Sequence, residues 1–133
     1  MNLQKIETRK DGETNGWLMP IYRDYDEHFQ DYEIRFIYAS SVSPHCKKGP
    51  HLHHKRQGRL VCIVGQVEVI WRVDGEYRHS TLNSDDPEIF HIPTGVPFEI
   101  SNNTDSEAVV LNMADHAWKP DDQDSIEVKD WKP

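Results

Sequence analysis

The chain is built from short runs in which polar and apolar residues alternate, separated by turns rich in glycine, proline and asparagine. Residues 66–73 alternate in this way, the dipeptide Asp74-Gly75 is a strong hairpin signal, and residues 76–82 form the returning run. No long stretch keeps the 3.6-residue period of a helix. Many short strands at even spacing are typical of a sandwich or barrel, so we predict an all-β, antiparallel fold. Further strands are predicted at residues 32–38, 59–64, 88–92, 98–101 and 107–113.

The length of 133 residues fits a single domain. We expect residues 32–113 to form the core of this domain and residues 1–31 to form an N-terminal strand or arm. The acidic, proline-interrupted segment 114–133 is expected to be irregular. A first strand near residues 17–22 would leave an unprotected edge, so we expect subunits to pair through it as a homodimer.

Charge and hydropathy limit the partners of the chain. The formal net charge of −8 argues against nucleic acid. No apolar run reaches the length of a membrane span, and the N-terminus lacks the apolar core of a signal peptide, so we expect no membrane partner and a cytoplasmic location. The two cysteines, Cys46 and Cys62, do not have the spacing of a zinc motif, which favours reduced thiols.

One part of this acidic chain is purely basic. Residues 34–67 contain no Asp or Glu, whereas Arg35, Arg59 and four further Lys or Arg residues fall there. This basic segment indicates a local positive field for an anionic small molecule such as a diphosphate. Arg35 and Arg59 are the stronger candidates because they lie within strand-like runs. A solvated loop is the alternative interpretation for the other four, Lys47, Lys48, Lys55 and Arg56.

Two histidines, His51 and His53, lie in the basic segment and are separated by one residue. On a strand this spacing points both imidazoles to the same face, roughly 7 Å apart along the backbone. Histidine has a pKa near the working pH, so it can take and return a proton without the help of a metal. The pair is therefore a candidate for acid–base catalysis, with His51 as the principal base and His53 as its partner or shuttle.

The segment around these histidines, with Gln57, Gly65 and residues 93–102, resembles the two motifs of the cupin β-barrels, H-x-H-x3-E-x7-G and P-x-G-x2-H-x3-N. The resemblance implies a single cupin-type antiparallel β-barrel, or jelly roll. Gln57 and Phe98 stand where metal-binding cupins have a Glu and a third His. We therefore expect the pocket to be retained without a tightly bound metal or another cofactor.

Shorter patterns narrow the resemblance to enzymes of nucleotide sugars. The chain is similar to the nucleotide-sugar 3,4-ketoisomerases, which act on thymidine-diphosphate-linked 4-keto-6-deoxyglucose, in Arg35-x-x-Tyr38, Gly49-x-His51-x-His53-x-Lys55 and Leu60-Val61-Cys62-x-x-Gly65. It resembles the dTDP-4-dehydrorhamnose 3,5-epimerases in Lys48-Gly49-x-His51, Arg59-Leu60-Val61 and Ile92-Pro93-x-Gly95. The resemblance covers residues 32–131.

The resemblance implies an isomerase whose partner is a small nucleoside-diphosphate sugar. A proton next to a ketone is acidic enough for enolisation, and the resulting oxyanion needs a nearby donor or cation. We expect Arg35 and Arg59 to steady the diphosphate or this oxyanion. The other expected substrate-binding residues are Tyr38, Gln57, His91 and Phe98.

Three alternatives stay open from the sequence. An epimerase needs an acid on the opposite face of the sugar ring, and residues 108–113 lack the tyrosine that the epimerases have there, so Tyr38 or His91 would have to replace it. A metal-dependent dioxygenase or lyase would use His51, His53, His91 and an altered ligand such as Gln57. A non-catalytic cupin would bind a nucleotide sugar without turnover.

Overall fold

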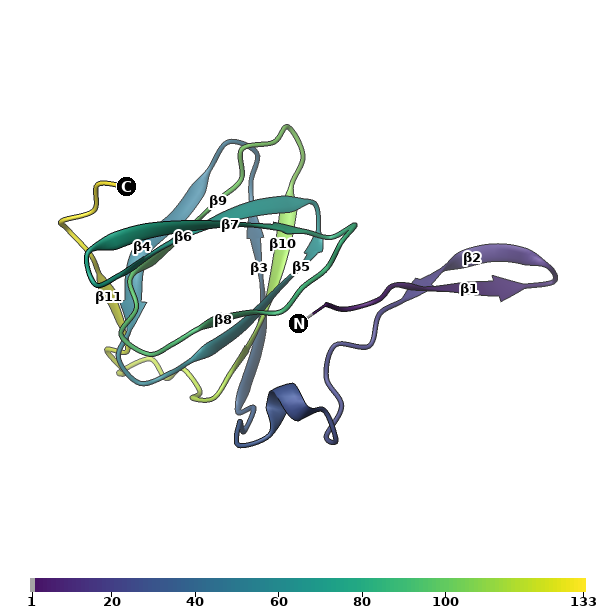
Figure 1. Cartoon of the computed structure of the whole chain (residues 1–133), viewed down its shortest axis with the longest axis horizontal. Helices are drawn as coiled ribbons and strands as arrows, with labels where there is room; N and C mark the ends of the chain where they lie inside the picture. Colours follow the sequence, from purple (N-terminus) through teal and green to yellow (C-terminus); the bar gives the residue numbers. More distant parts are fainter. Residues whose placement is uncertain (1) are drawn as a thin grey trace.

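The computed structural model describes residues 2–133 and contains two antiparallel sheets and one separate hairpin (Figure 1). A four-stranded sheet has the order β3-β10-β5-β8, and a five-stranded sheet has the order β11-β4-β9-β6-β7. The strands are β1 (Ile6–Lys10), β2 (Glu13–Leu18), β3 (Phe36–Val42), β4 (Lys47–His53), β5 (Gly58–Val64), β6 (Gln66–Val73), β7 (Glu76–Asn83), β8 (Phe90–Ile92), β9 (Phe98–Ser101), β10 (Ala108–Ala114) and β11 (Ser125–Glu127).

The two sheets face each other and enclose the main core (Figure 1). Alternate residues of each strand point inward, as a pleated strand requires. Core side chains include Leu60 and Cys62 of β5, Val69 of β6 and Val110 of β10. This arrangement is a cupin-type jelly roll, so the prediction of an all-β antiparallel fold is confirmed. In residues 2–133 no helix is long and apolar enough to cross a membrane.

A second, smaller cluster covers the outer face of the four-stranded sheet. The segment before β3, which includes the short 3-10 helix η1 (Glu27–Phe29), packs Phe29 and Tyr32 against Met113 of β10. The Tyr32 hydroxyl donates to the Met113 carbonyl oxygen at 2.6 Å. This sheet therefore has an inner face toward the main core and an outer face that is covered in part by residues preceding β3.

The N-terminal strands differ from the prediction. The first two strands are β1 and β2, which pair through a turn at Asp11 and Gly12, and residues 19–22 lie outside any strand. Both turn residues have positive φ, of 54° and 80°, the conformation of a tight hairpin turn. The hairpin projects away from the two sheets (Figure 1). The third strand begins at Phe36, not at Tyr32, because Tyr32 belongs to the cluster on the outer face.

The C-terminal segment is not wholly irregular, which corrects the prediction for residues 114–133. Strand β11 pairs with β4 and places Ser125 opposite His53 and Glu127 opposite His51. The Asp124 carboxylate, which is fully buried, accepts hydrogen bonds from the backbone N–H groups of Lys55 and Arg56. These groups would otherwise lack partners where β4 ends, which explains why the tail is ordered against it.

Candidate functional site

A cavity of about 210 Å³ lies between the two sheets and is lined by residues of β3, β4, β5, β9 and β10. The walls combine apolar side chains with a few polar groups, as small-molecule sites do. The lining residues are Tyr38, Ser40, Val42, Lys48, His51, Leu60, Phe98, Ile100, Val110 and Asn112.

The two histidines lie on the same face of β4, as their spacing predicts. Their ring centroids are 5.1 Å apart. His51 lines the cavity, and His53 is buried beside it, with 5% of its surface exposed. Phe98 of β9 contacts both rings, with centroid distances of 4.7 Å to His51 and 5.7 Å to His53. Phe98 therefore forms an apolar wall at the position where the cupin motif has its third histidine.

Both histidines are held in the neutral form by their surroundings. Burial lowers the pKa of His53 to about 4, and the nearby charges of Arg56 and His51 add to this effect against the opposing Asp124 carboxylate. Burial, and then the Arg56 charge, also lowers the pKa of His51. A neutral imidazole has a free lone pair at neutral pH, so His51 can accept a proton from a bound molecule.

The polar end of the cavity is organised by Tyr38 and Asn112. The Tyr38 hydroxyl oxygen accepts hydrogen bonds from Asn112 Nδ2 at 2.8 Å and from Arg56 Nη2 at 3.3 Å. Gly58 makes room for this contact, since a Cβ there would lie 2.9 Å from Asn112 Oδ1. Tyr38 thus lies in the cavity wall with a fixed hydroxyl group that can hydrogen-bond to a polar atom of a bound molecule.

Lys48 brings a positive charge to the rim of the cavity. Its side chain is exposed, yet it lines the cavity, and its Nζ donates to Ser40 Oγ at 2.6 Å. This bond joins β4 of one sheet to β3 of the other. A solvated loop was one of two interpretations of Lys48 from the sequence, and the structure places this residue beside the cavity.

Four of the expected substrate-binding residues do not join His51. Arg35 is exposed and pairs with Glu33 at 2.9 Å. Gln57, Arg59 and His91 form a separate group on the outer side of the four-stranded sheet, together with Asp115 and Tyr32. His91 Nε2 lies 2.8 Å from Gln57 Oε1, Gln57 Nε2 donates to Asp115 at 3.2 Å, and the Arg59 guanidinium lies 4.2 Å from the Tyr32 ring centroid.

The pleat of the strands explains this separation. Leu60 of β5 points into the cavity, so its neighbour Arg59 must point outward. Phe90 and Ile92 of β8 pack in or against the main core, so His91 between them faces the other way. The interpretation that His91 enters the pocket is therefore corrected. Tyr38 and Phe98 are the two expected substrate-binding residues that do line the cavity with His51.

The basic segment is largely neutralised by carboxylates. Lys55 Nζ donates to Asp122 at 2.8 Å, and the Arg56 guanidinium lies 3.4 Å from the Asp124 carboxylate. Both acids come from the C-terminal tail, more than 60 residues later in the chain. Lys55 and Arg56 therefore do not form an open positive patch, contrary to one interpretation of the sequence.

Asp124 and Asn112 were not predicted from the sequence, and Arg56 was considered only as a cation of the basic segment, with a solvated loop as the alternative. Arg56 is 8% exposed and turns inward beside His53, and Asp124 meets it from the tail. The alternation of Ser125, Ile126 and Glu127 is the one signal that could have indicated a strand at this point.

Among the side chains that the structure describes, which leave out those of Met1 and His28, no three His, Cys, Asp or Glu residues gather closely enough to hold one metal ion. In particular, His91 lies on the far side of the four-stranded sheet from His51. The expectation that the site has no tightly bound metal stays a prediction.

Several solved structures share the fold. A dTDP sugar isomerase from Desulfovibrio desulfuricans G20 has a TM-score of 0.80 at 22% identity, covering 96% of this chain and 80% of that one. The sugar 3,4-ketoisomerase QdtA from Thermoanaerobacterium thermosaccharolyticum, solved in complex with TDP, has a TM-score of 0.70 at 24% identity, covering 97% and 90%.

The capsular polysaccharide assembling protein CapF from Staphylococcus aureus also resembles the chain, with a TM-score of 0.64 and 23% identity. The match covers 69% of this chain and only 26% of CapF, so the chain spans about a quarter of that protein. Among curated proteins, none matches the chain.

A family model matches almost the entire chain. The model named FdtA and described as "WxcM-like, C-terminal" matches residues 1–131, nearly the whole chain. The chain therefore belongs to the WxcM-like, C-terminal (FdtA) family of cupin-fold proteins.

Proposed function

We propose that the protein is an isomerase of nucleoside-diphosphate-linked 4-keto-6-deoxy sugars, which moves the carbonyl group from C4 to C3. The observation that carries this proposal is the neutral His51 in the wall of a cavity that also presents the Tyr38 hydroxyl and the Lys48 ammonium. Membership of the family and the fold shared with a sugar 3,4-ketoisomerase support it.

We expect His51 to begin such a reaction as the base. His51 removes the proton from C3, the C–H electrons form a double bond between C3 and C4, and the C4 oxygen takes up a proton to give an enediol. Loss of the proton from O3 and return of a proton to C4 then give the 3-keto product. The oxyanion that develops during enolisation needs a donor, and Tyr38 and Lys48 are the candidates that line the cavity.

The volume of the cavity limits which part of the substrate enters. A cavity of about 210 Å³ is smaller than the usual pockets for whole drug-sized ligands, so we infer that it takes the sugar ring alone. The nucleoside diphosphate then lies outside, at the rim. Lys48 replaces Arg35 and Arg59 in this proposal as the cation nearest to the diphosphate, because those arginines lie away from the cavity.

The test is incubation with thymidine-diphosphate-linked 4-keto-6-deoxyglucose in heavy water, followed by NMR. A 3,4-ketoisomerase yields a 3-keto product and leaves C5 unlabelled. Deuterium at both C3 and C5, with the ketone still at C4, would replace the proposal by the epimerase. Binding without any exchange would favour the non-catalytic cupin, and a reaction that stops after chelation and resumes with added metal would favour a metal-dependent enzyme.

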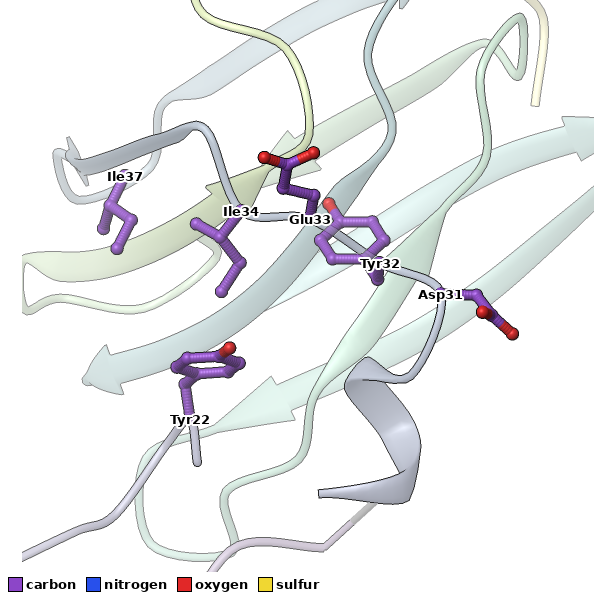
Figure 2. A pocket seen from close by; sticks show the side chains of 6 residues that line it. All are labelled: Tyr22, Asp31, Tyr32, Glu33, Ile34 and Ile37. Carbon is purple, nitrogen blue, oxygen red and sulfur yellow. The ribbon is translucent and has the colours of Figure 1, made fainter. Parts of the chain in front are cut away.

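We also propose that two copies associate through the outer face of the four-stranded sheet. Strand β3 is the edge of this sheet, and its outward residue Ile37 is 58% exposed. Ile37 borders a groove of about 740 Å³ that is also lined by Tyr22, Asp31, Tyr32, Glu33 and Ile34 (Figure 2). An apolar edge and the projecting hairpin, with Trp17 and Leu18 exposed, together fit a second copy of this chain.

Ile37→Glu is expected to convert a dimer into a monomer, because it places a charge in the apolar part of this face. Light scattering coupled to size-exclusion chromatography measures the mass. Thr81→Glu is the matched control, since Thr81 is exposed on β7 at the far edge of the other sheet. A dimer that persists in both Ile37→Glu and Trp17→Glu would contradict the proposed interface.

A further inference from the structure

Arg56 is a buried cation that has no role in the proposed reaction as described above. The segment after β4 turns inward and leaves this side chain 8% exposed between His53 and Tyr38. Its Nη2 lies 3.3 Å from the Tyr38 hydroxyl oxygen and 3.3 Å from His53 Nε2. A guanidinium taken out of water at this position requires compensation.

The compensation comes from Asp124. The carboxylate is fully buried, and its Oδ2 lies 3.4 Å from Arg56 Nη1 and 3.5 Å from His53 Nδ1. Its other oxygen accepts the backbone N–H groups of Lys55 and Arg56. A buried ion pair is weak evidence for stability, because desolvation offsets most of the attraction. The contacts of this pair with His53 point to an effect on that histidine.

The chemistry of arginine decides the protonation of His53. A guanidinium can only donate hydrogen bonds, so the nitrogen that faces Arg56 must be an acceptor without a hydrogen. That nitrogen is Nε2, which leaves the proton of a neutral ring on Nδ1, the nitrogen that lies 3.5 Å from Asp124 Oδ2. The Nε2 lone pair of His53 is therefore engaged by Arg56 and its Nδ1 is buried near a carboxylate, whereas His51 lines the cavity.

We propose that the Arg56–Asp124 pair fixes His53 as a neutral Nδ1–H imidazole and thereby makes the two histidines unequal, with His51 alone exchanging protons with the substrate. Arg56, Asp124 and His53 are positioning residues in this account. The role of His51 in this proposal rests on the proposed isomerase function. The protonation state of His53, in contrast, is a property of the protein without substrate.

The groups that face His53 from each packed element agree with this assignment. They are His51 on β4, Arg56 on the following turn, Tyr38 on β3 through Arg56, and Asp124 before β11. The pKa of His53 is lowered to about 4, first by burial and then by Arg56, so the ring stays neutral above about pH 5. Loss of the Arg56 charge would raise this pKa. It would remove a cation that disfavours the protonated ring and would leave the Asp124 carboxylate, which favours it.

NMR of the full chain with ¹⁵N-labelled histidine tests the proposal, with the His53 signals assigned from a His53→Asn variant. The wild type should show a single Nδ1–H tautomer for His53 from pH 8 to pH 5. In Arg56→Met the tautomer preference should be lost and the ring should become protonated at a higher pH, by about one unit or more. Lys55→Met is the matched control, because it removes the same charge one residue away and leaves the signals unchanged.

Kinetics supply a second readout. In Arg56→Met the acid limb of the pH profile of kcat should move to higher pH. Arg56→Lys keeps the positive charge and should show part of the wild-type profile. A general loss of structure would lower kcat without moving the acid limb. An Nε2–H tautomer in the wild type, or an unchanged His53 spectrum in Arg56→Met, would overturn the proposal. If the NMR result holds but no isomerase turnover is found, the proposed function fails and the assignment of His53 stands.

Discussion

Replacing His51 by Asn is expected to lower turnover by at least about a hundredfold while leaving substrate binding nearly unchanged. Asparagine keeps much of the volume and polarity of the ring but has no basic nitrogen. His51 lines the cavity, and its lowered pKa leaves it unprotonated at neutral pH. Single-turnover NMR measures the loss of reaction, and calorimetric titration with the 4-keto nucleotide sugar measures binding.

The control for this variant is His54→Asn. His54 directly follows β4 and is exposed. Its substitution makes the same chemical change in the same basic segment, but His54 does not line the cavity. Its turnover should equal that of the wild type. If His51→Asn keeps turnover within a few-fold of the wild type, the role of His51 as the base is wrong.

Replacing Phe98 by Ala is expected to lower the free energy of unfolding by about 3–5 kcal/mol, the usual cost of truncating a buried phenylalanine. Phe98 is 3% exposed and packs between both histidine rings and the core. The empty volume would lie beside His51, so turnover should fall as well. Urea denaturation followed by tryptophan fluorescence measures the change in stability.

Phe98→Leu separates packing from the aromatic contact. Leucine fills part of the volume, so the loss of unfolding free energy should be smaller than in Phe98→Ala. A loss below about 1 kcal/mol in Phe98→Ala would contradict the observed packing, since a buried ring of this size cannot be removed from a dense core without a large effect.

Local patterns in the sequence were sufficient to predict many of the strands and the strand face that carries the two histidines. The Asp74-Gly75 hairpin joins β6 and β7 with the expected alternation. The His-x-His spacing places both rings on one face of β4, and the cupin motifs locate Phe98 beside them. These features depend on residues close together in the chain, where the period of two in a strand is decisive.

The parts of the site that were missed depend on contacts between distant segments. Arg59 was preferred over Arg56 because it lies in a strand, but the pleat turns Arg59 outward, while the turn after β4 brings Arg56 inward. The Asp124 carboxylate, 68 residues later in the C-terminal tail, compensates the charge of the buried Arg56. The only local signal near that carboxylate is the three-residue alternation of β11, which directly follows Asp124 and is too short to identify a partner for Arg56.

The measurement that tests the central claim most directly follows a deuterium atom placed at C3 of the 4-keto nucleotide sugar. The claim is that His51 removes the hydrogen at this carbon. In ordinary water the wild type and His54→Asn should release the deuterium from C3 as the 3-keto product forms, and His51→Asn should retain it at C3. Retention of the deuterium at C3 in the presence of the wild type, or its release by His51→Asn at the wild-type rate, would contradict the account.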